Sequence, residues 1–307
     1  MERRGAAVGM AEDAEAWLWE SPMVLAATPI GNLADATDRL RMLIRSAEVI
    51  ACEDTRSTRH LIQALGERTS ARLVSLHQHN EAARSAELVE QAAAGTRVLV
   101  VSDAGTPGVS DPGRRLVSAA IEAGTAVTAA PGASAVPTAL ILSGLPTDRF
   151  SFGGFVPRRQ SERRALLDRL SSEEWTTVLF ESPHRIAATV AECARALGGG
   201  RRAAVARELT KKYEEVLRGD LDDLAQRLSR RRDGSGLKGE FVLVVAGASP
   251  GDGEGHELLT VEDAAALVLQ QAAEGQRIKT AAKQVASEHR LSASELYDAA
   301  HRLRDLR

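Results

Sequence analysis

One stretch of the chain, Leu99 to Gly113, constrains the fold more than any other. It begins within an apolar, mostly β-branched run, Val98 to Val101, which is typical of a strand buried on both faces of a sheet. A polar loop follows, in which prolines fix φ and glycines permit positive φ, and a helical pattern begins at Arg114. Ordinary strand-to-helix turns have roughly 2–6 residues, and this one is longer. The length and composition therefore predict a ligand-binding loop at the carboxyl end of a parallel strand.

The length and composition predict a globular protein of about two domains. The chain has 307 residues, of which 44% are hydrophobic and 26% charged. The net charge is −3, so a nucleic-acid partner would need a local basic patch. The two cysteines, Cys52 and Cys193, lie far apart, which favours a reducing compartment, and we expect a cytoplasmic protein without a signal peptide or membrane span.

Strands and helices alternate along the first half of the chain, which predicts a mostly parallel sheet with helices on both faces. The expected strands are 23–27, 48–52, 72–76, 98–101 and 126–130. The second half is less regular, so a mixed sheet is expected there. Its expected strands are 150–155, 178–181, 203–207, 214–218 and 241–246.

Changes in composition indicate where the domains begin and end. We expect an extension at 1–22, an N-terminal α/β domain at 23–132, a second α/β domain at 133–248 and a helical C-terminal domain at 256–307. A Gly/Ser/Pro-rich linker, 249–255, precedes the last of these. The tail predicts three short helices, and Ile278 to Leu303 resembles a helix-turn-helix pair. The Lys and Arg residues of the tail are balanced by Asp and Glu, which favours packing or dimerisation over nucleic-acid recognition.

Several common binding motifs are absent from the sequence. It contains no dinucleotide fingerprint, no phosphate-binding P-loop and no paired-cysteine or HExxH metal motif. His77 and His79 form a histidine pair without a third nitrogen or sulfur ligand nearby, so we expect no metal site.

A basic stretch at the start of an expected helix is the best nucleic-acid signal. It contains Arg158, Arg159, Arg163 and Arg164. Cations are disfavoured near a helix N-terminus by the helix dipole. If these arginines lack internal partners, their position predicts contact with an external anion such as an RNA phosphate. A solvated helix face is the alternative.

A series of motifs then identifies a family. These are ATPIGNLADAT at 27–37, ACEDTRSTRHL at 51–61, SLHQHNE at 75–81, VSDAGTPGVSDPG at 101–113, PGASA at 131–135, SGLPTDRFSFGGFVPR at 143–158, FESPHR at 180–185, ARELTKKYEEVLRG at 206–219 and KGEFVLVV at 238–245. In this order they resemble the ribosomal RNA small subunit methyltransferase I family, part of the tetrapyrrole methylase superfamily. The resemblance covers residues 23–303.

The resemblance implies the two-domain tetrapyrrole-methylase-like fold, with S-adenosylmethionine bound in the cleft between the domains. It implies 2′-O-methylation of a cytidine in the decoding centre of 16S rRNA, within the small ribosomal subunit, by a homodimer. Position by position, it assigns cofactor contacts to Pro29, Gly31, Asp103, Gly105, Thr106, Val109, Ser134 and Ala135. Small-molecule members usually have Gly-Asp-Pro at the long loop, whereas this chain has Gly105-Thr106-Pro107, as the rRNA members do.

A ribose hydroxyl is a weak nucleophile, so a nearby base should assist the reaction. Asp54 and Glu181 each end or follow an apolar strand, which would hold their carboxylates at the cleft, and Glu208 is a third candidate. The alternative is that Arg56 and Arg185 pair with these acids and fix the loops.

Two other functions stay open from the sequence. One is a methyltransferase of the same superfamily that acts on a small molecule, of the tetrapyrrole or diphthine type. The other is a non-catalytic RNA-binding protein that has kept the fold. The arginine-rich stretch and the helical tail favour RNA methylation over the first, and the intact glycine-rich loops count against the second.

Overall fold

The structure is a computed structural model that describes residues 17–233, 236–248, 261–273, 276–289 and 291–305. Contacts between residues divide it into two compact units, with the boundary between Gly247 and Ala248. The first unit contains two β-sheets, and the second contains helices. The predicted linker 249–255 lies outside the described residues. The finer division of the first unit at residue 132 stays a prediction.

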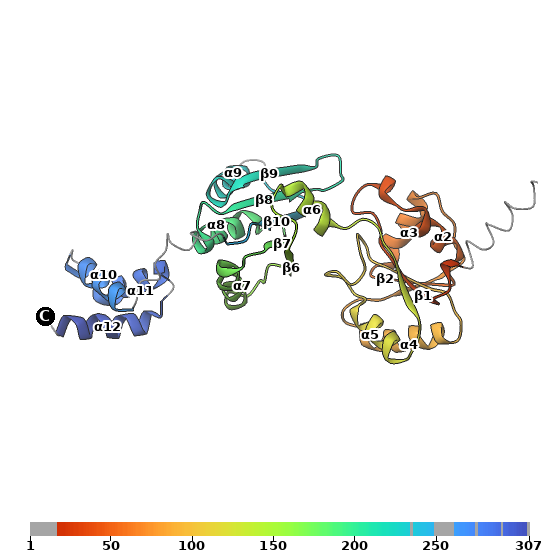
Figure 1. Ribbon diagram of the computed structural model, residues 1–307, viewed down its shortest axis with the longest axis horizontal. Coiled ribbons are helices and arrows are strands. Elements are labelled where there is room, and N and C mark those ends of the chain that lie inside the picture. The colour runs from red at the N-terminus through yellow and green to blue at the C-terminus, as the bar shows by residue number, and fades with distance from the viewer. Residues whose placement is uncertain (1–16, 234–235, 249–260, 274–275, 290, 306–307) are drawn as a thin grey trace, which may run out of the picture. The chain divides into compact units, whose positions relative to one another are not determined.

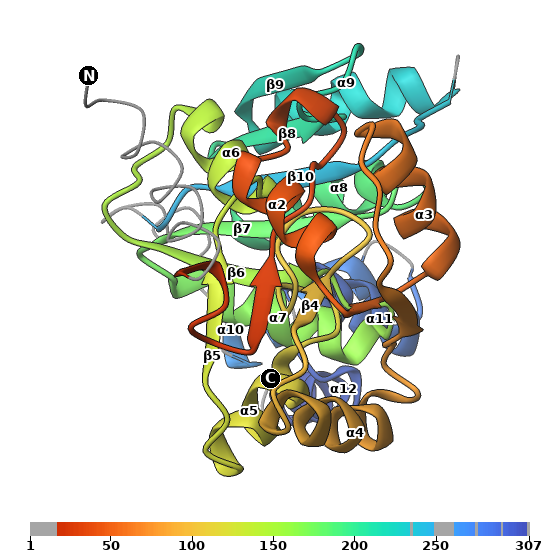
Figure 2. The same ribbon diagram turned by 90° about the vertical axis from the view of Figure 1, so that its right-hand side faces the viewer.

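The first sheet is wholly parallel, with the strand order β3-β2-β4-β1-β5. Its strands are β1 (Met23–Ala26), β2 (Val49–Cys52), β3 (Arg72–Ser75), β4 (Val98–Val101) and β5 (Val127–Ala130). Figure 2 shows β1 between β4 and β5. The predicted parallel sheet is confirmed, and the loops after its strands meet at one edge.

Helices cover both faces of this sheet (Figure 1). They are α2 (Asp38–Ser46) and α3 (Thr55–Ala64) on one face, and α4 (Glu81–Ala93) and α5 (Arg114–Glu122) on the other, with a 3₁₀ turn, η1, at Leu33–Asp35. In β4, Leu99 and Val101 pack with α2 and α3, whereas Val98 and Val100 pack with α4 and α5. The apolar run is thus buried on both faces because strand side chains alternate between them.

The packed part of the chain begins earlier than the expected start near residue 23. Leu18 is buried in the α2–α3 side of the core. The Trp19 indole donates a hydrogen bond to Ser46 Oγ over 3.0 Å, and the Arg39 guanidinium lies 4.7 Å from the Trp17 ring centroid. Trp19 and Trp17 thus contact α2, although Trp17 stays 56% exposed, and sequence periodicity alone did not indicate these contacts.

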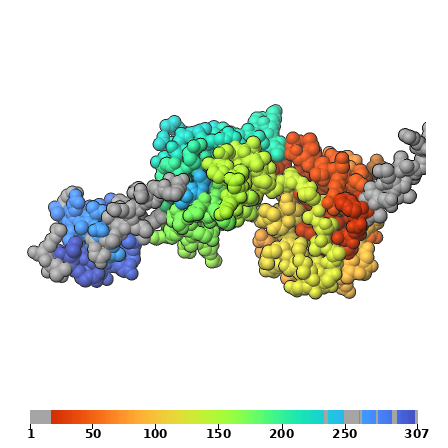
Figure 3. Space-filling model, viewed as in Figure 1, coloured from red at the N-terminus to blue at the C-terminus, as the bar shows by residue number. Residues whose placement is uncertain are grey.

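The second sheet is mixed, as predicted, with the order β6-β7-β10-β8-β9. Only the β6–β7 pair is parallel. The strands are β6 (Phe150–Phe155), β7 (Thr176–Glu181), β8 (Arg202–Arg207), β9 (Glu215–Asp220) and β10 (Phe241–Val245). In Figure 3 the side chains of this region form a closely packed mass in green and cyan.

Helices also cover both faces of the second sheet. One face packs against α7 (Gln160–Ser172), α8 (Ile186–Leu197) and α9 (Leu221–Asp233), and the other against α6 (Ala135–Ser143). Ile30, from the loop after β1, joins the core on the α6 side. A loop of the first sheet is therefore anchored in the core of the second, and this positions the site described below.

The described residues of the second unit form a cluster of three helices, which confirms the expected helical tail. Its helices are α10 (Val261–Ala273), α11 (Ile278–His289) and α12 (Ala293–Asp305). Val268, Val285 and Leu296 are buried at the centre of its core. No helix among the described residues is long and apolar enough to cross a bilayer.

Candidate active site

A cavity of about 380 Å³ lies where loops of the first sheet face the second sheet. Small-molecule ligands commonly occupy cavities of roughly 300–1,000 Å³. The first sheet contributes Ile30, Ala104, Gly105, Thr106, Val109, Ser110 and Asp111, and the start of α6 contributes Ser134 and Ala135. The second sheet contributes Phe155, Phe180, Glu181, Ser182, Pro183, Gly239, Glu240, Phe241 and Val242.

The long loop after β4 is held in a defined path at both ends. At its start, Thr28 and Gly105 exchange backbone hydrogen bonds of 2.9 and 3.1 Å. At its end, the buried carboxylate of Glu81 accepts the amides of Gly113 and Arg115 over 2.9 and 3.1 Å, at the N-terminus of α5. Between these anchors Ser110 has a φ of +65°, a strained value for a residue with a side chain. The loop that the sequence singled out is therefore preorganised beside the cavity.

The residues predicted to hold the cofactor fall into two groups. Gly105, Thr106, Val109, Ser134 and Ala135 all line the cavity. Pro29, Gly31 and Asp103 are not among its lining residues, although Ile30, between the first two, is.

Gly31 and Asp103 make contacts of their own. A β-carbon at Gly31 would lie 2.3 Å from Cγ of Lys211, so the missing side chain makes room for the stem of that lysine. The Asp103 carboxylate accepts the amide of Asp54 over 3.2 Å and so ties together the loops after β4 and β2.

Three carboxylates gather at the carboxyl edge of the first sheet: Glu53, Asp103 and Asp111. Burial, with the charges of Glu53 and Asp103, raises the pKa of Asp111 to about 6. Burial and the charge of Asp103 also raise the pKa of Glu53. Of the three, Asp111 lines the cavity. This concentration of negative charge favours a cationic ligand group or a transferable proton.

Asp54, predicted as a catalytic acid, is the N-cap of α3. Its Oδ1 accepts the Arg56 amide over 2.7 Å, and its Oδ2 lies 2.9 Å from Arg56 Nη2. These hydrogen bonds from Arg56 lower the pKa of Asp54 to about 2. Asp54 is not one of the cavity-lining residues.

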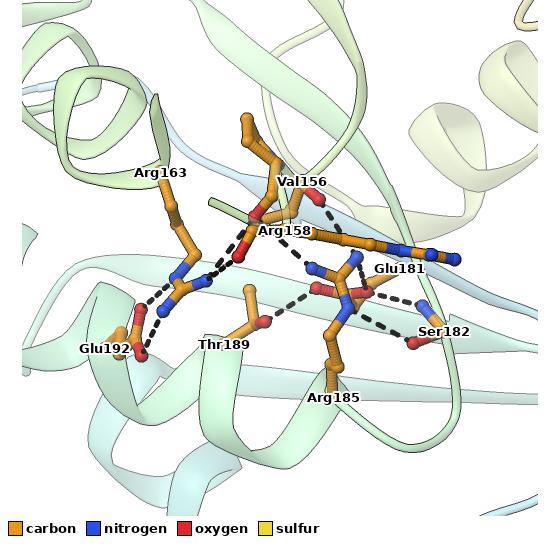
Figure 4. A network of polar contacts seen from close by, with 9 residues as sticks. Val156, Arg158, Arg163, Glu181, Ser182, Arg185, Thr189 and Glu192 are labelled. Carbon is orange, nitrogen blue, oxygen red and sulfur yellow. Dashed lines mark hydrogen bonds and ion pairs between the residues drawn. The ribbon is translucent and has the colours of Figure 1, made fainter. Parts of the chain in front are cut away.

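Glu181, the second predicted acid, does line the cavity, but its carboxylate is fully engaged. Its side chain is 0% exposed. Oε1 accepts the Ser182 amide and lies 2.6 Å from Arg185 Nη2, and Oε2 accepts the Thr189 hydroxyl over 2.7 Å (Figure 4). The ion pair between Glu181 and Arg185, which the sequence left as the alternative to a catalytic role, is present in the structure.

Glu208, the third predicted acid, lies outside the lining residues and has a left-handed φ of +50°. Its Oε1 accepts hydrogen bonds from Lys211 Nζ over 2.9 Å and from the Glu240 amide over 3.0 Å. Burial acts to raise the pKa of Glu208, but these two hydrogen bonds, together with the charges of Lys211 and Arg207, outweigh it and the pKa is lowered.

The arginine-rich stretch does not act as one surface. Arg163 forms a two-pronged ion pair with Glu192 of α8, at 2.6 and 3.2 Å, so the assumption that it lacks an internal partner was wrong. Arg159 lies 3.4 Å from Glu162 and is 81% exposed. Arg158 is exposed, and its guanidinium has no partner among the residues that the structure describes. Arg164 is also exposed but does interact within the described chain.

Sequence reasoning missed Asp111, Phe155 and Phe180 as cavity residues. Asp111 was visible as an acid in the long loop, but nothing local distinguished it from Asp103. The two phenylalanines were visible only as strand residues. Within the described residues, no group of three His, Cys, Asp or Glu side chains is arranged to hold a metal ion.

Comparisons with known proteins place the chain. The family model of the Tetrapyrrole (Corrin/Porphyrin) Methylases matches residues 22–225. A protein of Mycobacterium bovis named Ribosomal RNA small subunit methyltransferase I is 47% identical over 278 residues, covering 90% of this chain and 93% of its own length. The protein of the same name from Synechocystis is 42% identical over 275 residues, covering 90% of this chain and 95% of its own length. A crystal structure of diphthine synthase shares the fold, with a TM-score of 0.56 and 19% sequence identity. The match covers 73% of this chain and 89% of the diphthine synthase chain.

The chain belongs to the tetrapyrrole methylases and, within them, to the ribosomal RNA small subunit methyltransferase I family. It is a methyltransferase, and S-adenosylmethionine is its methyl donor.

The cavity fits this cofactor by its chemistry. A β-carbon at Gly105, where φ is +81°, would lie 3.2 Å from Ile30 Cγ2, so a side chain there would crowd the cavity wall. Ile30, Phe180 and Val242 offer apolar surface for an adenine ring. Ser134 occupies the N-cap of α6 without making a side-chain capping bond. The carboxylates near Asp111 suit the positive charges of a sulfonium and an ammonium group.

Proposed function

We propose that this protein transfers a methyl group from S-adenosylmethionine to the 2′-hydroxyl of a cytidine in the decoding centre of 16S rRNA. The relatives at 40–47% identity named for ribosomal RNA small subunit methylation support an rRNA substrate. The observation that carries the proposal is the cavity itself, where a preorganised glycine-containing loop faces exposed aromatic surface of the second sheet. Such a site can hold a small cofactor on one side and a nucleotide on the other.

Positioning supplies much of the rate in this proposal. The bound cofactor supplies an activated methyl group on its sulfonium. The restrained loops after β1 and β4, with the start of α6, would fix the cofactor so that the acceptor oxygen approaches in line. The contacts proposed for this are those of Pro29, Gly31, Asp103, Gly105, Thr106, Val109, Ser134 and Ala135.

Asp111 is the carboxylate best placed to take the proton of the acceptor hydroxyl. It lines the cavity, and its raised pKa of about 6 makes it a stronger base than an ordinary aspartate while leaving it largely ionised at pH 7. Asp54, Glu181 and Glu208 remain candidates. Their carboxylates are engaged by Arg56, Arg185 and Lys211, which favours a positioning role for each.

The proposal includes the partners and location expected from the sequence. The substrate is rRNA within the small ribosomal subunit, the enzyme is a cytoplasmic homodimer, and Arg158, Arg159, Arg163 and Arg164 are the candidate RNA contacts. Because Arg163 is paired with Glu192 and donates a hydrogen bond to the Arg158 carbonyl, we propose that Arg163 fixes the loop that carries Arg158.

A labelling assay tests the function. Purified protein is incubated with methyl-labelled S-adenosylmethionine and small ribosomal subunits that lack the modification, with a free tetrapyrrole and a diphthine-precursor protein as parallel acceptors. The expected label is in 16S rRNA, at one cytidine whose 3′ phosphodiester resists alkaline hydrolysis because its 2′-hydroxyl is blocked. Label in either parallel acceptor, with none in rRNA, would show that the enzyme is a small-molecule or protein methyltransferase instead.

A further inference from the structure

Three of the five phenylalanines of this chain line the cavity. The sequence contains five, and all lie on β6, β7 and β10 of the second sheet. Phe155, Phe180 and Phe241 line the cavity. Phe241 is buried, whereas Phe155 is 58% exposed. An aromatic ring left open to solvent beside a cavity leaves a planar apolar face available to a ligand.

A bulge in β6 places Phe155 there. Phe152 is paired with Val178, but Phe155 is paired with Phe180, so β6 has one residue more than β7 in this interval. The extra residue reverses the alternation of side chains and brings Phe155 to the same face as Phe152. Both rings make edge-to-face contacts with Phe180, at centroid distances of 5.4 and 4.9 Å.

Glycines make this bulge possible. A β-carbon at Gly153 would lie 2.6 Å from Leu179 Cδ2, and Gly154 has a φ of +69°. Both positions therefore disfavour residues with side chains.

The backbone after Phe155 is fixed by two arginines (Figure 4). Arg185 donates to the carbonyls of Val156 and Pro157, over 2.9 and 3.3 Å, and Arg163 donates to that of Arg158 over 3.2 Å. Each arginine is itself held by an acid, Arg185 by Glu181 and Arg163 by Glu192. The segment is thus rigid before any ligand binds, which limits the entropy lost on binding.

Arg158 stands out in this network because its guanidinium has no partner among the residues that the structure describes. Its carbonyl is used, but no dashed line in Figure 4 ends on its guanidinium. One rigid segment thus carries an exposed aromatic ring and, three residues later, a guanidinium that no residue in the described part of the chain engages. Single-stranded nucleotides are bound by this combination, with stacking on the base and a cation at the phosphate.

We propose that Phe155 is the stacking platform for the base of the nucleotide that is methylated, and that Arg158 binds a phosphate of the same RNA strand. This inference rests on the proposed function, since it requires an RNA acceptor. A nucleotide whose ribose enters the cavity must leave its stack, and Phe155 replaces the stacking that it loses. Glu181 and Glu192 then act as positioning residues, through Arg185 and Arg163.

The test compares Phe155→Ala, Phe155→Tyr and Phe150→Ala with the parent enzyme on unmethylated small subunits. Phe150, 41% exposed at the other end of β6 and absent from the cavity lining, is the matched control. Phe155→Ala should lower kcat/KM by about 5- to 150-fold, the range found for loss of one base stack. Phe155→Tyr and Phe150→Ala should stay close to the parent, and calorimetry should give an unchanged Kd for S-adenosylmethionine in all three.

Arg158 is tested by the salt dependence of RNA binding, with Arg169→Ala on α7 as the control. Arg158→Ala should reduce the slope of log K against log salt by about one, and Arg169→Ala should not change it. An unchanged slope for Arg158→Ala, a parental kcat/KM for Phe155→Ala, or a raised Kd for the cofactor in Phe155→Ala would each overturn the assignment. If the parent enzyme leaves small subunits unmethylated, the proposed function fails as well, and this inference falls with it.

Discussion

Replacing Glu181 with glutamine separates a structural role from a catalytic one. The glutamine keeps the shape of the side chain but removes its charge. With its amide oxygen in the place of Oε1 it still accepts from Ser182 and Arg185, and its nitrogen faces the Thr189 hydroxyl, which can turn to accept, so what is lost is the ion pair with Arg185. Removing one partner of a buried ion pair commonly costs about 3–5 kcal/mol. The Arg185 side chain is 27% exposed and retains some water, so we expect a loss below that range, about 2–3 kcal/mol.

The loss is measured as a fall in Tm. One kcal/mol shifts Tm by about 2–4 °C in a domain of 150–250 residues, so Glu181→Gln should lower Tm by about 4–12 °C in differential scanning calorimetry. Asp54→Asn is the control, because its ion pair with Arg56 is exposed and its removal should leave Tm unchanged.

The same variant should affect catalysis through the loop rather than through proton transfer. Released from Glu181, Arg185 would hold the Val156 and Pro157 carbonyls less firmly, which should raise KM for small subunits. A Glu181→Gln enzyme with parental Tm and parental KM but a kcat reduced a hundredfold or more would refute this reasoning and identify Glu181 as a catalytic base.

The site supports four further predictions. Gly105→Val should abolish S-adenosylmethionine binding in calorimetry while the protein remains folded by circular dichroism, because valine disfavours a φ of +81° and would crowd Ile30; unchanged affinity would place the cofactor elsewhere. If Asp111 is the base, kcat/KM should decrease below about pH 6 as its carboxylate is protonated. Asp111→Asn should abolish this decrease and most of the turnover. A parental pH profile in Asp111→Asn would exclude Asp111 as the base. Because the folded pKa of Asp111 is raised, its contribution to stability falls as pH rises from about 4 to 6, so Asp111→Asn should raise Tm at pH 8 more than at pH 4. Arg163→Glu should lower Tm by breaking the pair with Glu192, whereas Arg159→Glu should weaken RNA binding at parental Tm. A parental Tm for Arg163→Glu, with a lowered Tm for Arg159→Glu, would contradict a structural role for Arg163 and an RNA-binding role for Arg159.

The sequence by itself determined the sheet and the loop that lies beside the cavity. The run Val98 to Val101 is buried on both faces, as its composition predicted, and the loop that follows supplies Gly105, Thr106 and Val109 to the cavity. These features could be predicted because strand periodicity and the conformational preferences of glycine and proline act within a few residues. The family motifs added the cofactor, which no local pattern indicates.

Tertiary structure alone decided which charged groups are free. Arg163 and Arg158 belong to one basic stretch, yet Glu192, 29 residues beyond Arg163, engages the first and leaves the second open. Asp111 and Glu181 both reach the cavity, but Arg185 and Thr189 engage only Glu181. Ion pairs and burial depend on how separate elements pack, and a sequence pattern records the residues of one element at a time.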